Sequence, residues 1–152
     1  MSTLRTGSPS STGILACVGF VCCGLVALLA QTTRTVWDGV YTEDQAKRGE
    51  SLYQKECARC HGVSLTGGEE APPLSGAAFL ANWSGTTMGD LIERVRATMP
   101  PDSLGRLSRQ QHADILSHIL RANDFPPGKT ELPHETELLK QIRIEAAKPA
   151  ER

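Results

Sequence analysis

The sequence predicts a small domain built mainly of helices. Residues 42–45 and 108–111 have the pattern of a capping box, and apolar residues at helical spacing follow each of them. Residues 62–86, between them, are rich in Gly and Pro and show no strand alternation. A chain of 152 residues has room for one small domain. We therefore expect an all-α fold.

The composition indicates that something other than protein fills part of the interior. Aromatic residues make up only 5% of the chain, which also contains 14 Gly and 9 Pro. So few large side chains give a thin core. The formal net charge of −1 provides no basic excess for holding phosphates, so nucleic acid is not an expected partner.

The first 30 residues have the pattern of an export signal or a membrane anchor. A polar start with a single cation precedes residues 13–30, which carry no charge. This run is longer than most signal cores and reaches the lower limit for a membrane-spanning helix. Cleavage after Ala30 would place Leu28 where a small residue is preferred, so both interpretations stay open. Either one places residues 31–152 in the periplasm, soluble after cleavage or anchored in the inner membrane without it.

A helix is predicted over residues 42–57, after a linker at residues 31–41. Gly49 lies inside this helix. A glycine there costs about 1 kcal/mol relative to Ala, so we expect the close approach of another helix as compensation. The expected partner is the helix predicted over residues 108–123, which has an apolar stripe.

The chemistry is expected where the first helix ends, at Cys57-Ala58-Arg59-Cys60-His61. This is the spacing of c-type haem attachment. Two thiols separated by two residues point to the same side, so both can form thioethers to one haem. His61 then supplies an imidazole nitrogen as an axial ligand to the iron.

Three other interpretations of the cysteine pair are less favourable. A thioredoxin-like dithiol needs Cys at the start of a helix in a strand–helix context, whereas this pair ends a helix. A zinc site needs four ligands, and residues 31–152 contain no second Cys pair. A disulfide between Cys57 and Cys60 is the remaining alternative.

The sixth iron position decides the function, because a filled position suits electron transfer and an open one allows reaction. The candidate ligands are Met88, Met99, His112, His118 and His134. Met99 ends the helix predicted over residues 87–98, and Pro100 pushes it out of helical geometry. Its sulfur can then turn toward the metal, so Met99 is the predicted ligand, with a core-filling role as the alternative. We expect Met88 at the surface or the rim of the site, His118 in the core and His134 in solvent.

The segment after His61 is expected to lie over the haem. The carbonyl of Pro72 can accept the second ring proton of His61, which would fix the tautomer and raise the basicity of the imidazole. Leu74 and Trp83 are expected to contact the haem. The indole N–H of Trp83 can also donate to a haem propionate, with simple packing as the alternative. Phe79 is expected in the ordinary core.

The domain is expected to cover residues 42–128, because the sequence Asp-Phe-Pro-Pro-Gly stops the last long helix. Residues 129–152 then form a C-terminal extension. Leu138, Leu139 and Ile142 have helical spacing and predict a short helix. A loose terminus is expected in the polar, Pro-containing end after Ile144.

Residues 40–123 resemble the class I c-type cytochromes, the small, mainly helical monohaem electron carriers. The resemblance rests on Gly49, Tyr53, the pentapeptide at 57–61, Pro72-Pro-Leu74-Ser-Gly76, Met99-Pro100 and Ala113-Asp114-Ile115-Leu116. It implies one haem c bound covalently through Cys57 and Cys60. It also implies His61 and Met99 as axial ligands, with the Pro72 carbonyl bonded to His61. His118 departs from the family, which often has Tyr at that position.

The expected function is one-electron transfer with both axial positions filled. Residues 36–41 and 123–128 look like the flanks of bacterial cytochromes found with, or fused to, quinoprotein alcohol dehydrogenases. We therefore expect redox protein partners, with such a dehydrogenase as donor and an oxidase as acceptor, docking at a haem edge near Lys55 and Arg59. Two alternatives stay open, an open-site, peroxidase-like haem enzyme and a haem-based sensory module, although the sequence shows no evident distal catalytic group or output domain.

Overall fold

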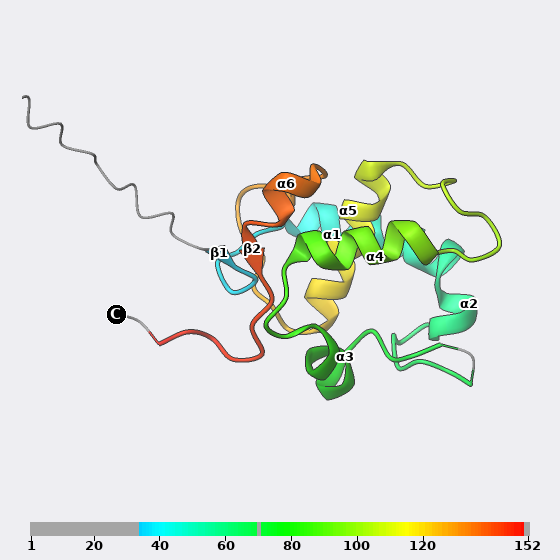
Figure 1. Cartoon of the computed structure of the whole chain (residues 1–152), viewed down its shortest axis with the longest axis horizontal. Helices are drawn as coiled ribbons and strands as arrows, with labels where there is room; N and C mark the ends of the chain where they lie inside the picture. Colours follow the sequence, from blue (N-terminus) through cyan, green and yellow to red (C-terminus); the bar gives the residue numbers. More distant parts are fainter. Residues whose placement is uncertain (1–33, 70, 151–152) are drawn as a thin grey trace, which may run out of the picture. The chain divides into compact units, whose positions relative to one another are not determined.

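The computed structural model describes residues 34–69 and 71–150. Within these ranges it contains two short strands and six helices (Figure 1). Their order is β1 (Arg34–Thr35), α1 (Glu43–Glu56), α2 (Ala58–His61), α3 (Gly76–Trp83), α4 (Met88–Thr98), α5 (Arg109–Ala122), α6 (Thr136–Leu139) and β2 (Ile142–Arg143). The prediction of an all-α fold is confirmed.

The predicted export signal or anchor, residues 1–30, lies outside the described residues. Among the helices that the structure describes, none has both the length and the apolar character needed to cross a membrane.

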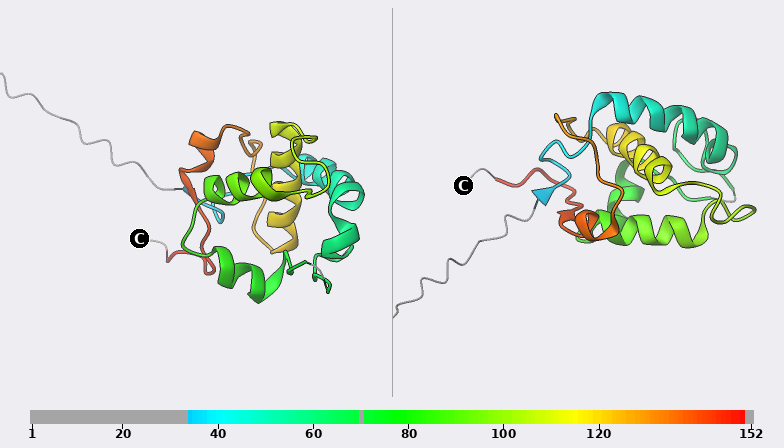
Figure 2. Two further views of the ribbon diagram at one scale, coloured as in Figure 1. Left: turned by 45° about the vertical axis from the view of Figure 1, so that its right-hand side comes forward. Right: turned by 90° about the horizontal axis from the view of Figure 1, so that it is seen from above.

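Helices α1 and α5 pack directly against each other (Figure 2). At their crossing, a Cβ added to Gly49 would collide with the Asp114 carbonyl and lie 3.1 Å from the Cβ of His118. Tyr53 packs beside His118, with 5.2 Å between the ring centroids. The close helix approach predicted from Gly49 is therefore confirmed, and His118 occupies the core as expected.

The two predicted capping boxes differ in the structure. At α5 the box is complete, since Ser108 and Gln111 each bond the backbone N–H of the other, at 3.2 and 2.8 Å. At α1 only Thr42 caps, accepting from the Gln45 N–H at 3.2 Å. The buried Gln45 side chain instead bonds the backbone of Leu132 at 2.6 and 3.0 Å. It thereby ties the segment after α5 to the first helix.

Residues 62–86 contain a helix that the sequence analysis did not predict, α3. It begins after Ser75 and buries Phe79. Helix α4 follows, with Met88 in its first turn completely buried. The expectation of a surface position for Met88 is wrong, because α6 and β2 pack against α4.

The chain after α5 belongs to the packed domain as far as Ile144. Leu139, Ile142 and Ile144 are each exposed by 1% or less, and β2 pairs in parallel with β1. The Ile144 carbonyl accepts from the Gly85 N–H at 2.8 Å, and its own N–H donates to Thr86 at 2.9 Å. The prediction of a short helix here is confirmed by α6, but Ile142, which was expected on that helix, lies in β2.

Candidate haem site

A cavity of about 690 Å³ lies among α2, α3, α4 and α5. Its volume is typical of sites for small molecules and cofactors. Much of its wall is apolar and includes Phe79, Leu91, Val95, Ile115, Leu116 and Ile119. All the residues predicted for the haem site line this one cavity, namely Cys57, Cys60, His61, Pro72, Leu74, Trp83 and Met99.

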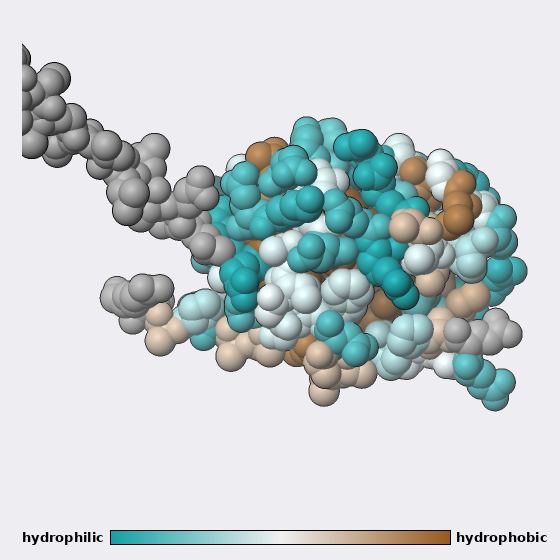
Figure 3. Space-filling view, viewed as in Figure 1, coloured by the Kyte–Doolittle hydropathy of each residue, from teal (hydrophilic) through white to brown (hydrophobic). Residues whose placement is uncertain are grey.

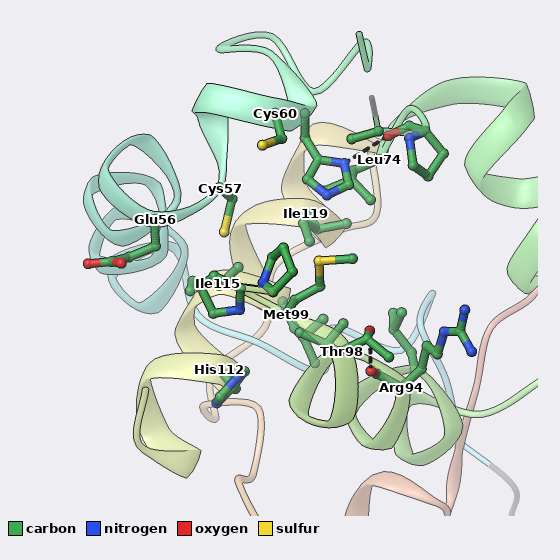
Figure 4. A pocket seen from close by; sticks show the side chains of 18 of the residues that line it. Glu56, Cys57, Cys60, Leu74, Arg94, Thr98, Met99, His112, Ile115 and Ile119 are labelled. Carbon is green, nitrogen blue, oxygen red and sulfur yellow. Dashed lines mark hydrogen bonds between the residues drawn. The ribbon is translucent and has the colours of Figure 1, made fainter. Parts of the chain in front are cut away.

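Cys57 and Cys60 are free thiols that face the same space as Met99 (Figure 4). Burial raises the pKa of the Cys57 thiol to about 11, and the neighbouring Cys60 contributes to the rise. Such a thiol is protonated at neutral pH, unlike the reactive thiolate of a thioredoxin-like dithiol. Residues 34–69 and 71–150 contain no group of three or more His, Cys, Asp or Glu that could hold a metal ion.

His61 ends α2 and is 7% exposed. Its Nδ1 lies 2.8 Å from the carbonyl oxygen of Pro72, so Nδ1 carries the proton and donates it to this hydrogen bond. The Nε2 then keeps its lone pair, as an iron ligand requires. This is the contact that the sequence analysis expected of Pro72.

The turn after His61 is held by the first helix. The hydroxyl group of Tyr53, in α1, donates to the carbonyl of Gly62 at 2.7 Å. The backbone N–H of Gly67 donates to the carbonyl of His61 at 2.9 Å. The imidazole is therefore fixed both through its ring and through the backbone on which it stands.

Met99 stands where α4 ends. Its backbone is extended, with φ −129° and ψ 142°, and the bond to Pro100 is cis. Figure 4 shows the Met99 side chain in the same cavity that Cys57 and Cys60 face. The side chain is 36% exposed. Met99 therefore has a non-helical backbone, as predicted from the proline that follows it.

The other candidate ligands are placed differently. His112 also lines the cavity, but its Nδ1 bonds the Ser108 carbonyl at 2.9 Å, and its buried Nε2 has no hydrogen-bond partner in the described part of the chain. Burial lowers the pKa of His112, which keeps the ring neutral at pH 7. His118 lies in the α1–α5 contact, and neither Met88 nor His134 lines the cavity.

Several charged residues at the cavity were not singled out by the sequence analysis. Lys55 and Arg59 were expected there, and the structure adds Glu56, Arg94, Asp102 and Arg106. No local pattern could have identified these four, because three separate segments bring them together only when the chain folds.

The donor set and the cavity fit a covalently attached haem. Two thiols, an imidazole with a free Nε2 and a thioether face one largely apolar space. The indole N–H of the half-buried Trp83 also has no hydrogen-bond partner among the described residues, so it is free to donate to an acidic group in the cavity.

Comparison with known proteins agrees with this geometry. The family model described as "Cytochrome C oxidase, cbb3-type, subunit III" matches residues 44–119, which are half of the chain and include both the cysteine pair and Met99. No curated protein and no solved structure matches the chain. The chain therefore belongs to this family, and the matched residues form a class I c-type cytochrome domain.

Proposed function

We propose that the protein is a periplasmic one-electron carrier, with one haem bound covalently through Cys57 and Cys60 and ligated by His61 and Met99. The observation that carries this proposal is the convergence of these four side chains on one cavity, with His61 held in the ligating tautomer. Membership of the cytochrome c family supports a haem-based electron carrier.

The bound haem would supply a one-electron ferric/ferrous couple. The Met99 thioether favours the ferrous state and therefore raises the reduction potential. The Pro72 carbonyl orients His61, and apolar side chains such as Leu74 and Ile115 exclude water from the metal. The indole N–H of Trp83 would donate to a haem propionate. Together these residues would hold the haem and keep its two axial ligands in place in both oxidation states.

Partners would dock at the end of the domain that carries α2 and the loop after α4. Val63, directly after α2, and Leu104, in the loop after α4, are 68% and 57% exposed. Figure 3 shows apolar residues among polar ones at this end of the domain. Lys55 and Arg59, which line the cavity, are also largely exposed. The proposed donor is a dehydrogenase, with a quinoprotein alcohol dehydrogenase as the specific candidate. The proposed acceptor is a respiratory oxidase, in keeping with the oxidase named in the family description.

Residues 1–30 would export the domain and either be cleaved or remain as an anchor. Purification from an export-competent host, followed by mass measurement, tests both points. We expect a mass increased by one haem that stays with the polypeptide in acidified organic solvent. Extraction of the pigment by that solvent, or a colourless protein, would contradict covalent attachment.

The ligation is tested by Met99→Ala. We expect loss of the ferric iron–sulfur absorption band and a lower reduction potential, because the thioether that stabilises ferrous iron is gone. Reduced wild-type protein should react with carbon monoxide slowly or not at all, and reduced Met99→Ala rapidly.

Met88→Leu is the matched control, since Met88 is buried in the core and does not line the cavity. It should keep both the band and the slow carbon monoxide reaction. A Met99→Ala protein with an unchanged band and potential would remove Met99 as ligand. Rapid reaction of the wild type with carbon monoxide would favour an open-site haem enzyme or sensory module instead.

A further inference from the structure

The loop that follows Met99 has few backbone ties to the rest of the domain. In the described structure, the backbone hydrogen bonds of residues 100–107 are internal, from Ser103 to Pro100 at 3.1 Å and from Arg106 to Ser103 at 3.2 Å. Of these residues, Pro100 is buried and Leu107 packs against the core. Met99 itself is tied to α4, because its backbone N–H donates to the Val95 carbonyl at 2.7 Å. The loop after it is therefore held against the rest of the domain by side-chain contacts.

Two ion pairs connect the loop to the segment that carries the cysteines. Arg59, between Cys57 and Cys60, pairs with Asp102 at 3.0 Å. Arg106 pairs with Glu56, the residue directly before Cys57. Both pairs thus join the haem-attachment segment to the segment of the proposed sixth ligand.

The two pairs differ in burial. The side chains of Arg59 and Asp102 are 78% and 58% exposed, so water and salt weaken that pair. The Glu56 side chain is only 5% exposed, and its buried Oε2 receives no well-formed hydrogen bond from the described residues. The charge of Glu56 is compensated by the Arg106 guanidinium, with the Lys55 ammonium farther away at 3.8 Å. A buried carboxylate without its cation is strongly unfavourable.

We propose that Glu56 and Arg106 form a clasp that holds the Met99 loop against the haem-attachment segment and so keeps the thioether on the iron. They are positioning residues, which act through Met99 and do not touch the metal. The proposal rests on the proposed function, because it requires His61 and Met99 as ligands. It goes further in assigning the stability of the iron–sulfur bond to a single ion pair.

The experiment compares ferric wild-type protein with Arg106→Gln, Glu56→Gln, the double variant and Arg106→Lys. Imidazole is titrated into each protein and displaces the thioether only in molecules whose Met99 has left the iron. We expect Arg106→Gln to weaken the iron–sulfur band and to increase the apparent affinity for imidazole by about tenfold, in proportion to the fraction of Met99-off protein. Arg106→Lys, which keeps the charge, should restore much of the wild-type behaviour.

Asp102→Asn is the matched control, because it breaks the exposed pair of the same loop. Its imidazole affinity should stay within about twofold of the wild type. The double variant should resemble Glu56→Gln, since Arg106 has then lost its partner. If Arg106→Gln fails to fold, Glu56→Gln provides the test, because it removes the charge and keeps the shape. We expect it to increase the imidazole affinity as well.

Two results would overturn the clasp. One is wild-type affinity for imidazole in both Arg106→Gln and Glu56→Gln. The other is an equal increase in the imidazole affinity of Asp102→Asn. This would show that the effect is not specific to the Glu56–Arg106 pair. If the wild type itself has no iron–sulfur band, the proposed ligation fails and the clasp fails with it. If the band is present and unaffected by the variants, the clasp alone fails.

Discussion

Gly49 has no side chain at the point where the α5 backbone comes closest to α1. A methyl group there would collide with the Asp114 carbonyl, which belongs to a helix backbone and cannot rotate away. The intrinsic preference of a helix for Ala over Gly is therefore outweighed by packing between helices. Because a glycine inside a helix has this intrinsic cost, its presence in the sequence alone predicted the close approach of another helix.

We predict that Gly49→Ala destabilises the domain by about 3 kcal/mol, the upper range for overpacking of a core. Urea denaturation of the holoprotein measures the change. Ser51→Ala, on the exposed side of the same helix, is the control and should stay within about 0.5 kcal/mol of the wild type. An equally stable Gly49→Ala protein would mean that the two helices can separate at no cost.

His118 makes the stability dependent on pH. It is 6% exposed, and burial, reinforced by the charge of Arg121 and opposed by that of Glu50, lowers its pKa in the folded protein. The unfolded chain therefore binds this proton at a higher pH than the folded one does. The free energy of unfolding should fall as the pH falls below about 6.5, the unperturbed pKa of His.

His118→Tyr, which introduces the residue common in the family, should reduce this pH dependence between about pH 7.5 and 5.5. Urea denaturation at several pH values measures it. Some dependence should remain, because burial lowers the pKa of His112 too. His134→Asn, at a partly exposed site, is the control, and a slope unchanged by His118→Tyr but reduced by His134→Asn would contradict the assignment.

At the scale of elements, the C-terminal segment completes the core. Leu139 is fully buried, whereas its neighbour Leu138 is 47% exposed. We predict that Leu139→Ala costs about 3 kcal/mol and that Leu138→Ala costs less than about 1 kcal/mol. Thermal or urea denaturation of the two variants measures the difference. Equal effects would show that the segment does not pack as a fixed part of the domain.

The long helices could be predicted, whereas α3 and the packing of the C-terminal segment into the core could not. Helices α1, α4 and α5 combine apolar spacing with a polar N-cap, and these signals are local. Helix α3 is short and follows a stretch rich in Gly and Pro, which is typical of a loop. The helix preference of its Ala residues was therefore not recognised in the sequence. The burial of Ile142 and Ile144 depends on contacts with β1 and with residues 85–86, far away in the sequence.

At the scale of the whole molecule, the candidate site was more predictable than the fold around it. The pentapeptide at residues 57–61 and the Met99-Pro100 pair are dense chemical signals, and the structure brings both to one cavity. Their roles in binding haem stay predictions. The charged residues Glu56 and Arg106 carry no such signal, because nothing in the local sequence around either one indicates that folding pairs them.

A cavity of about 690 Å³ in such a small domain also implies that haem contributes to the stability of the fold. We predict that a Cys57→Ser/Cys60→Ser protein, made without attached haem, has a Tm lower by more than about 10 °C, because each kcal/mol corresponds to roughly 4–8 °C at this size. Calorimetry and near-UV circular dichroism measure the loss of stability and of fixed packing. A double variant that is haem-free and as stable as the holoprotein would show that the cavity is not filled by a structural ligand.

Strands β1 and β2 lie side by side at one end of the domain, and α2 lies at the other (Figure 1). A linker joined to either strand therefore leaves the domain at the end opposite α2, the helix that carries Cys60 and His61. Immobilising the domain on an electrode through either strand should present the redox centre to solution. Tandem copies joined through these strands would likewise keep every centre accessible, so the fold is suited to use as a module in engineered electron-conducting chains.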